Sequence, residues 1–246
     1  VATPSGISLG PEGGAHQSIF TPLIGMGHAN LASFEPAYAD ELSAIMAWGF
    51  GHMQKSGGSS VYLRLSTRPL EQPAREMSST LKAGILAGAY WAVEPQPGAE
   101  LAIAYSGVVA PEAKAAFNII REDIPGAGLL AITSQDRLYS SWTAAAQARK
   151  GGHQGARSPI EQLLSELSPE ASLVTVQDGH PLALGWLGSV LGQRCEALGV
   201  DRFGQAGSVA QLYAEYGIDT DAVVDAVADI IVQQASVTTP SSITAE

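Results

Sequence analysis

The chain has 246 residues, of which 46% are hydrophobic and only 15% are charged, so it can bury a substantial core. Its 24 acidic and 13 basic residues give a formal charge of −11, which disfavours a surface for nucleic acid or anionic lipid. The single cysteine, Cys195, excludes an internal disulfide framework, and no apolar run approaches the ~20 residues needed to span a bilayer. No signal peptide is recognisable, so we expect a cytoplasmic protein without nucleic-acid or membrane partners.

The first third of the chain predicts a strand–helix–strand unit. Residues 1–36 carry little regular pattern, and Pro36 then opens a helix whose apolar positions recur at helical spacing. Gly57 and Gly58 end this helix, and residues 61–65 form an apolar strand. Such a unit is typical of α/β layer folds.

The rest of the chain alternates strands with helices. We expect strands at 101–105, 128–132, 173–176 and 194–198, and helices at 111–121, 135–149, 159–166 and 181–192. Ser208 is expected to cap a helix that ends at Tyr216, and Asp219 or Thr220 to cap the last helix. This order predicts an α/β fold with a mostly parallel mixed sheet covered on both faces.

A glycine-rich turn at Pro11–Gln17 contains the first candidate functional residue, His16. Glycine permits backbone conformations that are closed to other residues, so this turn can hold one imidazole at the mouth of a parallel sheet. The residues alone leave open a turn histidine that caps a neighbouring backbone carbonyl. Glu12, in the same turn, is expected to face water.

Several motifs resemble one enzyme family in their order and spacing. They are the His16 turn, Phe34-Glu35-Pro36-Ala37-Tyr38-Ala39-Asp40-Glu41, Asp178-Gly179-His180-Pro181, Phe203-Gly204-Gln205-Ala206-Gly207-Ser208 and Tyr216-Gly217-Ile218-Asp219. On these residues the chain resembles the thiamine-diphosphate enzymes of the transketolase and 2-oxoacid dehydrogenase superfamily. The likeness covers about residues 6–232 and is greatest to the homodimeric type of pyruvate dehydrogenase component.

The resemblance implies a division of the chain. Residues 1–70 would be the C-terminal half of a pyrimidine-binding domain, 71–82 a linker, 83–235 a transketolase C-terminal-type domain, and 236–246 a flexible tail. The diphosphate-binding domain and the first half of the pyrimidine-binding domain would lie outside this chain. Val1 would then mark a cut or a split in a longer enzyme.

The resemblance also implies an activity. The parent enzyme would decarboxylate a 2-oxoacid, most simply pyruvate, using thiamine diphosphate and Mg²⁺, and would pass the acyl group to a lipoyl acceptor. His16 would hydrogen-bond the substrate carboxylate or the adduct oxygen, and Gln17 would support the turn or the substrate pocket. The implied partners are the rest of the enzyme, a second copy in a homodimer, and a lipoyl acyltransferase. The chain by itself would bind no cofactor and would be inactive.

Two alternatives stay open. A transketolase or related sugar-phosphate synthase would need phosphate-binding arginines, to which Arg64 and Arg68 could contribute. Against it, Gly13-Gly14 stands where transketolases usually have Asp-Gly. The other alternative is a non-catalytic dimerisation or regulatory module, although its missing partner domains should then leave an apolar patch exposed.

The remaining candidates favour structural roles. Asp178 and His180 resemble an acid/base pair, but the family places this region away from the chemistry. His28 is expected to be structural, and His52 to interact with the last carbonyls of its helix. Ser106-Gly107 stands where α/β folds often hold anions, or is an ordinary turn. Serine-nucleophile, metal-ligand and nucleotide-loop motifs are absent from the sequence.

Overall fold

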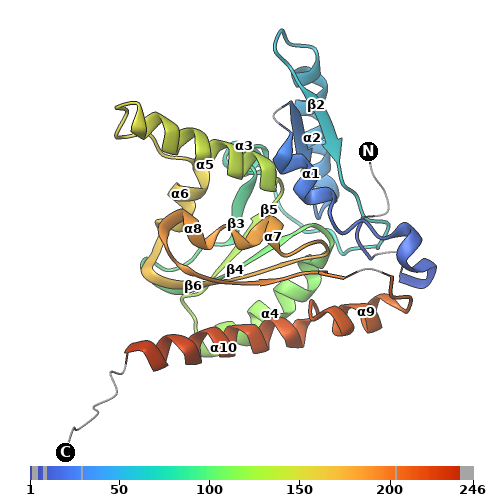
Figure 1. Ribbon diagram of the computed structural model, residues 1–246, viewed down its shortest axis with the longest axis vertical. Helices are drawn as coiled ribbons and strands as arrows, with labels where there is room; N and C mark the ends of the chain where they lie inside the picture. The colour runs from blue at the N-terminus through green and yellow to red at the C-terminus, as the bar shows by residue number, and fades with distance from the viewer. Residues whose placement is uncertain (2–4, 8–9, 29, 203, 239–246) are drawn as a thin grey trace, which may run out of the picture.

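The computed structural model describes residues 1, 5–7, 10–28, 30–202 and 204–238. Its larger part is built on a five-stranded sheet with the strand order β3-β5-β4-β6-β7 (Figure 1). The strands are β3 (Ala89–Val93), β4 (Ala99–Ser106), β5 (Gly128–Ile132), β6 (Leu167–Gln177) and β7 (Arg194–Leu198). All neighbours pair in parallel except β3, which runs antiparallel to β5 at one edge. The expected α/β fold with a mostly parallel mixed sheet is confirmed.

Helices cover both faces of this sheet. On one face lie α4 (Ala110–Asp123) and α10 (Thr220–Thr238), and on the other α5 (Gln135–Lys150), α6 (Pro159–Leu164), α7 (Leu182–Gly185) and α8 (Gly188–Leu191) (Figure 1). Leu101 and Ile103 of β4 pack in one core cluster with Phe117 of α4, whereas Ala102 and Ala104 pack in a second one. The alternation of side chains along β4 thus supplies both cores.

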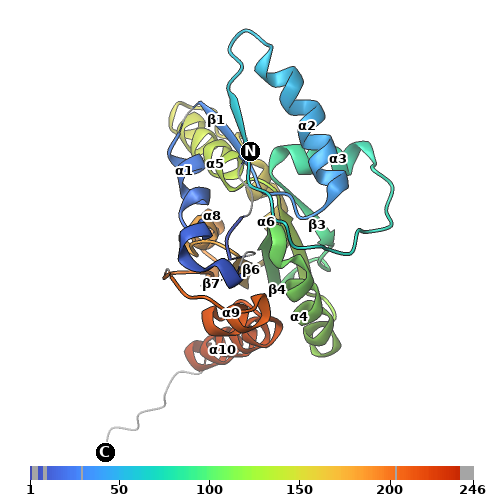
Figure 2. The ribbon, with the colours of Figure 1, turned by 90° about the vertical axis from the view of Figure 1, so that its right-hand side faces the viewer.

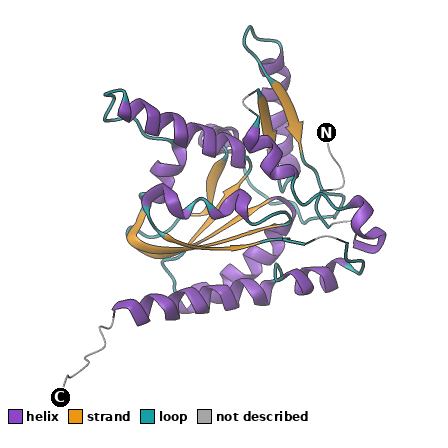
Figure 3. Cartoon of the chain, viewed as in Figure 1, coloured by secondary structure: helices purple, strands orange, loops and turns teal. Residues whose placement is uncertain are grey.

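A smaller unit precedes this sheet in the chain. It contains the 3₁₀ segment η1 (Gly10–His16), α1 (Thr21–Gly27), α2 (Ala39–Met53) and the parallel strands β1 (Leu31–Phe34) and β2 (Ser60–Leu63). Figure 3 shows the two strands as a separate small sheet, and Figure 2 shows α2 at the opposite end of the molecule from α10. The helix α3 (Ser79–Ala87) follows, and it contacts both α2 and β3.

Two short elements complete the fold: the 3₁₀ segment η2 (Gly107–Val109), which follows β4, and the helix α9 (Val209–Tyr216), which precedes α10. The expected cap of α9 is confirmed, because the Ser208 hydroxyl accepts a hydrogen bond from the Gln211 amide at 3.3 Å. The last helix is capped by Asp219, whose carboxylate accepts from the Ala222 amide at 2.9 Å.

The structure departs from the expected elements at several places. It adds α1, α3 and the edge strand β3, and it replaces the expected helix 181–192 by the two short helices α7 and α8. The strand expected at 173–176 extends from Leu167 to Gln177. The helix α3 begins inside the stretch 71–82, and α10 continues to Thr238, into the stretch expected to be a tail. Residues 239–246 lie outside the described part.

The core predicts a position-dependent cost of truncation. Ile103 is fully buried in the central strand, so Ile103→Ala should lower the free energy of unfolding by about 2–5 kcal/mol. Ile119 of α4 is 50% exposed, so Ile119→Ala should change the free energy of unfolding by less than about 1 kcal/mol. Urea unfolding of both variants measures the difference, and equal losses would contradict this description of the core.

Candidate functional site

The His16 turn is held against the loop that precedes α9. Gly13 has φ 70° and ψ −161°, a conformation that requires glycine and interrupts the 3₁₀ segment. The Gly207 amide donates to the Gly10 carbonyl at 3.2 Å, and Gln17 Nε2 donates to the Gln205 carbonyl at 2.7 Å. Hydrogen bonds therefore hold this turn against a loop that is almost 200 residues further along the chain. Phe203, the first residue of the expected Phe-Gly motif, lies outside the described residues.

The two predicted site residues differ in their surroundings. The His16 side chain is exposed and has no hydrogen-bond partner among the described residues. Gln17 is buried, and both ends of its amide are used, since Oε1 also accepts from the Gly204 amide at 3.4 Å. The structure thus shows Gln17 supporting the turn, which is one of its two expected roles. Contact of His16 or Gln17 with a substrate stays a prediction.

The ends of five strands, two from the small parallel sheet and three from the parallel part of the large sheet, meet at the junction of the two units. Polar side chains follow each strand there, and all of them are buried: Glu35 after β1, Arg64 after β2, Ser106 at the end of β4, Gln135 after β5, and Gln177 and Asp178 at the end of β6. The carboxyl ends of parallel strands are where α/β proteins commonly bind ligands. Here the side chains of the chain itself occupy that position.

Arg64 is the centre of this junction. Its guanidinium is 1% exposed and forms an ion pair with Glu35. Nη2 donates to the carbonyls of Ser18 at 2.9 Å and Asp178 at 2.6 Å, and Nε donates to the Thr21 hydroxyl at 3.1 Å. The guanidinium is therefore fully engaged inside the fold and is not free to bind a substrate phosphate.

Arg68, the second candidate for phosphate, is also paired. Its two terminal nitrogens donate to the two carboxylate oxygens of Glu112 at 3.0 and 2.7 Å. Its guanidinium carbon lies 5.2 Å from the ring centroid of Tyr213. This bidentate arrangement joins the segment after β2 to the first turn of α4.

The Ser106-Gly107 turn is filled rather than open. Gln135 Nε2 donates to the Ser106 hydroxyl at 2.8 Å and to Gln177 Oε1 at 3.2 Å. Gly107 has φ 64°, and a Cβ built on it would lie 2.7 Å from the Glu35 side chain. The turn is thus an ordinary buried βα connection. Glu35 can pack against it because Gly107 has no side chain. Burial raises the pKa of Glu35, against the opposing effect of the Arg64 charge.

Asp178 and His180 have separate structural roles. Asp178 is fully buried, and it accepts hydrogen bonds from the Ile7 amide at 2.9 Å and the Tyr213 hydroxyl at 3.3 Å. His180 Nδ1 accepts from the Leu182 amide at 3.2 Å, and its ring stacks on Phe20 at 5.2 Å. Within the described residues the two side chains do not bond to each other, so they form no acid/base pair.

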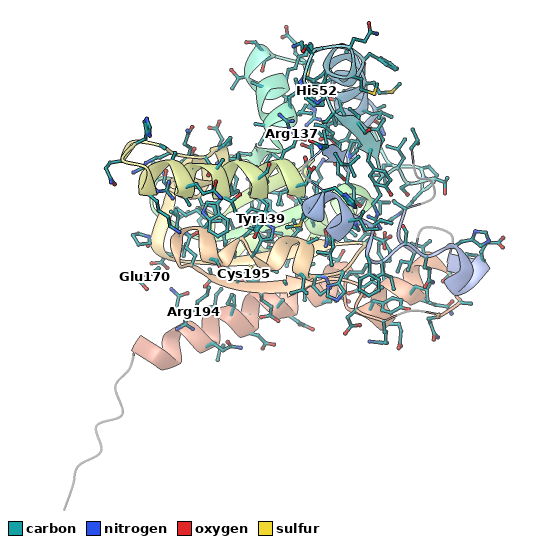
Figure 4. The ribbon with its side chains drawn as sticks, turned by 45° about the horizontal axis from the view of Figure 1, so that its top comes forward. His52, Arg137, Tyr139, Glu170, Arg194 and Cys195 are labelled. Atoms are coloured by element: carbon teal, nitrogen blue, oxygen red, sulfur yellow. The ribbon has the colours of Figure 1, made fainter. Side chains whose placement is uncertain are left out.

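The expectation for His52 was wrong. Its Nε2 lies 2.9 Å from the Ser59 hydroxyl and accepts from the Ser59 amide at 3.1 Å, so it joins α2 to the residue before β2 and does not bind the terminal carbonyls of α2. Its ring stacks on Trp48 at 4.4 Å, and the guanidinium carbon of Arg137 lies 4.7 Å from the Trp48 ring centroid. His52 and Arg137 are labelled in Figure 4. This stack attaches α2 to α5.

The described residues do not form a holder for Mg²⁺ or a diphosphate. They contain no group of three or more histidine, cysteine or acidic side chains that could hold a metal ion. The strand-end positions are occupied by internal ion pairs and hydrogen bonds, as given above. The residues of the described part therefore do not fit thiamine diphosphate or Mg²⁺ without further groups from elsewhere. Nor does any helix in that part have the length and apolar character to cross a membrane.

Comparison with known proteins agrees with this architecture. No protein-family model matches the chain. In sequence it is 23% identical over 233 residues to the chloroplastic transketolase of Craterostigma plantagineum, a match that covers 94% of this chain and 40% of the relative.

Solved structures give the same result. A mutant transketolase of Pichia stipitis superposes with a TM-score of 0.69 at 22% identity, over 96% of this chain and 30% of its own. The transketolase of Leishmania mexicana superposes with a TM-score of 0.63 at 21% identity, and the match covers 90% of this chain and 28% of the transketolase chain. The chain has a transketolase-type fold. The predicted resemblance is thus confirmed for the fold, which is that of part of a transketolase.

The buried Arg64–Glu35 pair should contribute more to stability than an exposed ion pair does. Arg64→Met would leave the Glu35 carboxylate buried without its partner, which should cost about 3–5 kcal/mol of unfolding free energy. Arg202→Met removes an exposed pair with Glu215 and should leave the unfolding midpoint unchanged. Urea denaturation of both variants compares them, and an unaltered Arg64→Met midpoint would contradict the role assigned to this guanidinium.

Asp178 predicts a pH dependence of stability. Burial raises its pKa in the folded protein to about 6 from an ordinary 3.8, so between these values the folded state holds a proton that the unfolded state releases. The contribution of this group to stability is therefore fully present below the lower value and is lost as the pH rises through the higher one.

Relative to Asp178→Asn, the wild type should lose stability as the pH rises through this window, at up to about 1.4 kcal/mol per pH unit. Urea unfolding at a series of pH values measures the difference between the two proteins. A difference that is constant with pH would show that Asp178 titrates normally in the folded state.

Proposed function

We propose that this chain is the C-terminal part of a thiamine-diphosphate-dependent enzyme that decarboxylates a 2-oxoacid, most simply pyruvate, and passes the acyl group to a lipoyl acceptor. The observation that carries the proposal is the transketolase-type fold over almost the whole chain, together with the His16 turn at its edge. The chain spans about 40% of its curated relative and about 30% of the solved transketolases. The cofactor and Mg²⁺ would accordingly be held by the remainder of the enzyme.

His16 is the residue of this chain proposed to meet the substrate. Its imidazole is exposed and unengaged among the described residues, while Gln17 and the Gly10 carbonyl fix the turn that carries it. A histidine held by a rigid backbone can donate a hydrogen bond to a substrate carboxylate with little loss of conformational entropy. The thiamine ring supplies the carbanion chemistry when it is bound, and this chain supplies positioning.

The preference for a 2-oxoacid over a sugar phosphate rests on the arginines. Arg64 and Arg68, the phosphate-binding candidates of this chain, are engaged by Glu35 and Glu112. Gly13-Gly14 also departs from the Asp-Gly that is usual in transketolases. Transketolase activity is the second candidate, and it is favoured by the names of the curated relative and of the solved structures.

An apolar surface on α2 supports a larger assembly over a self-sufficient non-catalytic module. Met46, Phe50 and Met53 are 39%, 57% and 48% exposed, and their spacing places them on one side of the helix. Such a contiguous apolar face is typical of a surface covered by another domain or subunit. We propose that the rest of the enzyme and a second copy cover it, that a lipoyl acyltransferase is a further partner, and that the protein is cytoplasmic.

The experiment that separates these functions uses the chain purified together with the polypeptides that accompany it. With thiamine diphosphate and Mg²⁺ added, pyruvate-dependent reduction of ferricyanide is compared with ketol transfer from xylulose 5-phosphate. Turnover of pyruvate alone supports the proposal, and turnover of xylulose 5-phosphate alone supports the second candidate. A folded chain that purifies alone and has neither activity would favour the non-catalytic module.

The role of His16 predicts a specific loss of activity. In the assembled enzyme, His16→Ala should lower kcat/KM for pyruvate by about a hundredfold or more, because a positioned donor is removed. His153, which is exposed in the turn after α5, provides the matched control, and His153→Ala should retain full activity. Steady-state kinetics checks both variants, and wild-type turnover by His16→Ala would exclude this role.

A further inference from the structure

A cavity with a volume of about 310 Å³ lies beside the segment that joins the two units. Pro73 of that segment, Val93 of β3, Leu129 of β5 and Phe117 of α4 contribute apolar walls. The polar groups that line it are Arg75, Tyr105, Lys114 and Asn118. A second hollow of about 510 Å³, open toward Tyr38, shares Pro73, Lys114 and Asn118 with it. The volume and the mixed lining are typical of a site for a small molecule, for which about 300–1,000 Å³ is usual.

Tyr105, which lines this cavity, has a buried hydroxyl without a hydrogen-bond partner among the described residues. The Tyr105 side chain is only 1% exposed, and its hydroxyl has no hydrogen-bond partner within the described residues. Tyr38 is a neighbour of this hydroxyl, but the two form no hydrogen bond of ordinary geometry. An unpaired buried hydroxyl costs free energy, so a retained one is expected to serve a ligand or a water.

The two cationic side chains that line the cavity, Arg75 and Lys114, differ in whether they are free to bind a ligand. Arg75 donates to both carboxylate oxygens of Asp40 at 2.7 and 3.0 Å and to the Tyr90 hydroxyl at 2.7 Å, so its charge and its donors are engaged. Lys114 has no ion pair among the described residues, and its ammonium lies 4.6 Å from the centroid of the Tyr38 ring. It is therefore the cation that is free to bind a ligand.

The arrangement on α4 directs these donors to one place. Lys114 and Asn118 are four residues apart in α4, so they lie on the same side of the helix. Their side chains and the Tyr105 hydroxyl together offer an ammonium, an amide and a phenol, all of which can donate. Asp40 and Glu41 neutralise the charge of Arg75, so Lys114 is the unpaired positive charge among the described lining residues, which suits a monoanion better than a dianion.

We propose that this cavity binds a small monocarboxylate with a short apolar body. The carboxylate lies between Lys114 Nζ and the Tyr105 hydroxyl, and the apolar body contacts Phe117 and Leu129. The site is separate from the His16 turn, and the proposal does not depend on the function proposed above.

The test is isothermal titration of the purified chain, with its companion polypeptides, by sodium isovalerate and sodium benzoate, and with inorganic phosphate as the comparison anion. We expect at least one of the two carboxylates to bind and phosphate not to bind. Lys114→Met should weaken carboxylate binding about tenfold or more, because a hydrogen-bonded charge pair is lost. The matched control is Lys82→Met, at an exposed lysine of α3, which should bind as the wild type does.

Tyr105→Phe provides the second variant, and thermal unfolding accompanies every titration. It should weaken binding several-fold while leaving Tm equal or higher, because it removes a hydroxyl that has no partner in the fold. A lower Tm would show that the hydroxyl stabilises the fold, which would overturn its assignment to a ligand. Absence of carboxylate binding by the wild type at millimolar concentration, binding of phosphate alone, or unchanged affinity in Lys114→Met would each overturn the proposal.

Discussion

The burial of one guanidinium constrains the rest of this structure. Arg64 lies where the small and the large sheet meet, and its donors are satisfied by three segments that are distant in sequence: Ser18 and Thr21, Glu35, and Asp178. A buried charge is tolerated only when it is paired and fully hydrogen-bonded. Moving either unit would uncover this charge. The position of the His16 turn, two residues before Ser18, depends on the same contacts.

This junction determines where chemistry can occur. The strand ends that commonly bind ligands in α/β proteins are occupied by an internal network around Glu35, Arg64 and Gln135. The group free to meet a substrate is instead at the edge, where His16 is exposed on a fixed turn. Together with the apolar face of α2, this arrangement is what we expect of a chain that completes a centre shared with other parts of an enzyme. That assignment is our proposal.

The sequence predicted the regular core well and the junction poorly. The strands at 128–132 and 194–198 were predicted at their exact bounds, because short apolar runs between turn residues are typical of a parallel sheet. Helix α1 was missed, because its glycines are poor helix formers and packing on α5 stabilises it. The Arg64–Glu35 pair joins residues 29 apart. The one sign of it is that each charged residue directly follows an apolar strand, and that pattern does not specify a partner.

We propose above that this chain is one part of a larger thiamine-diphosphate enzyme. Native mass spectrometry of the protein purified with its companions, followed by the denatured mass of every component, tests it most directly. We expect a complex in which this chain accompanies a second polypeptide, and a mass difference on loss of thiamine diphosphate. A lone 246-residue species, as monomer or dimer and without cofactor, would contradict it.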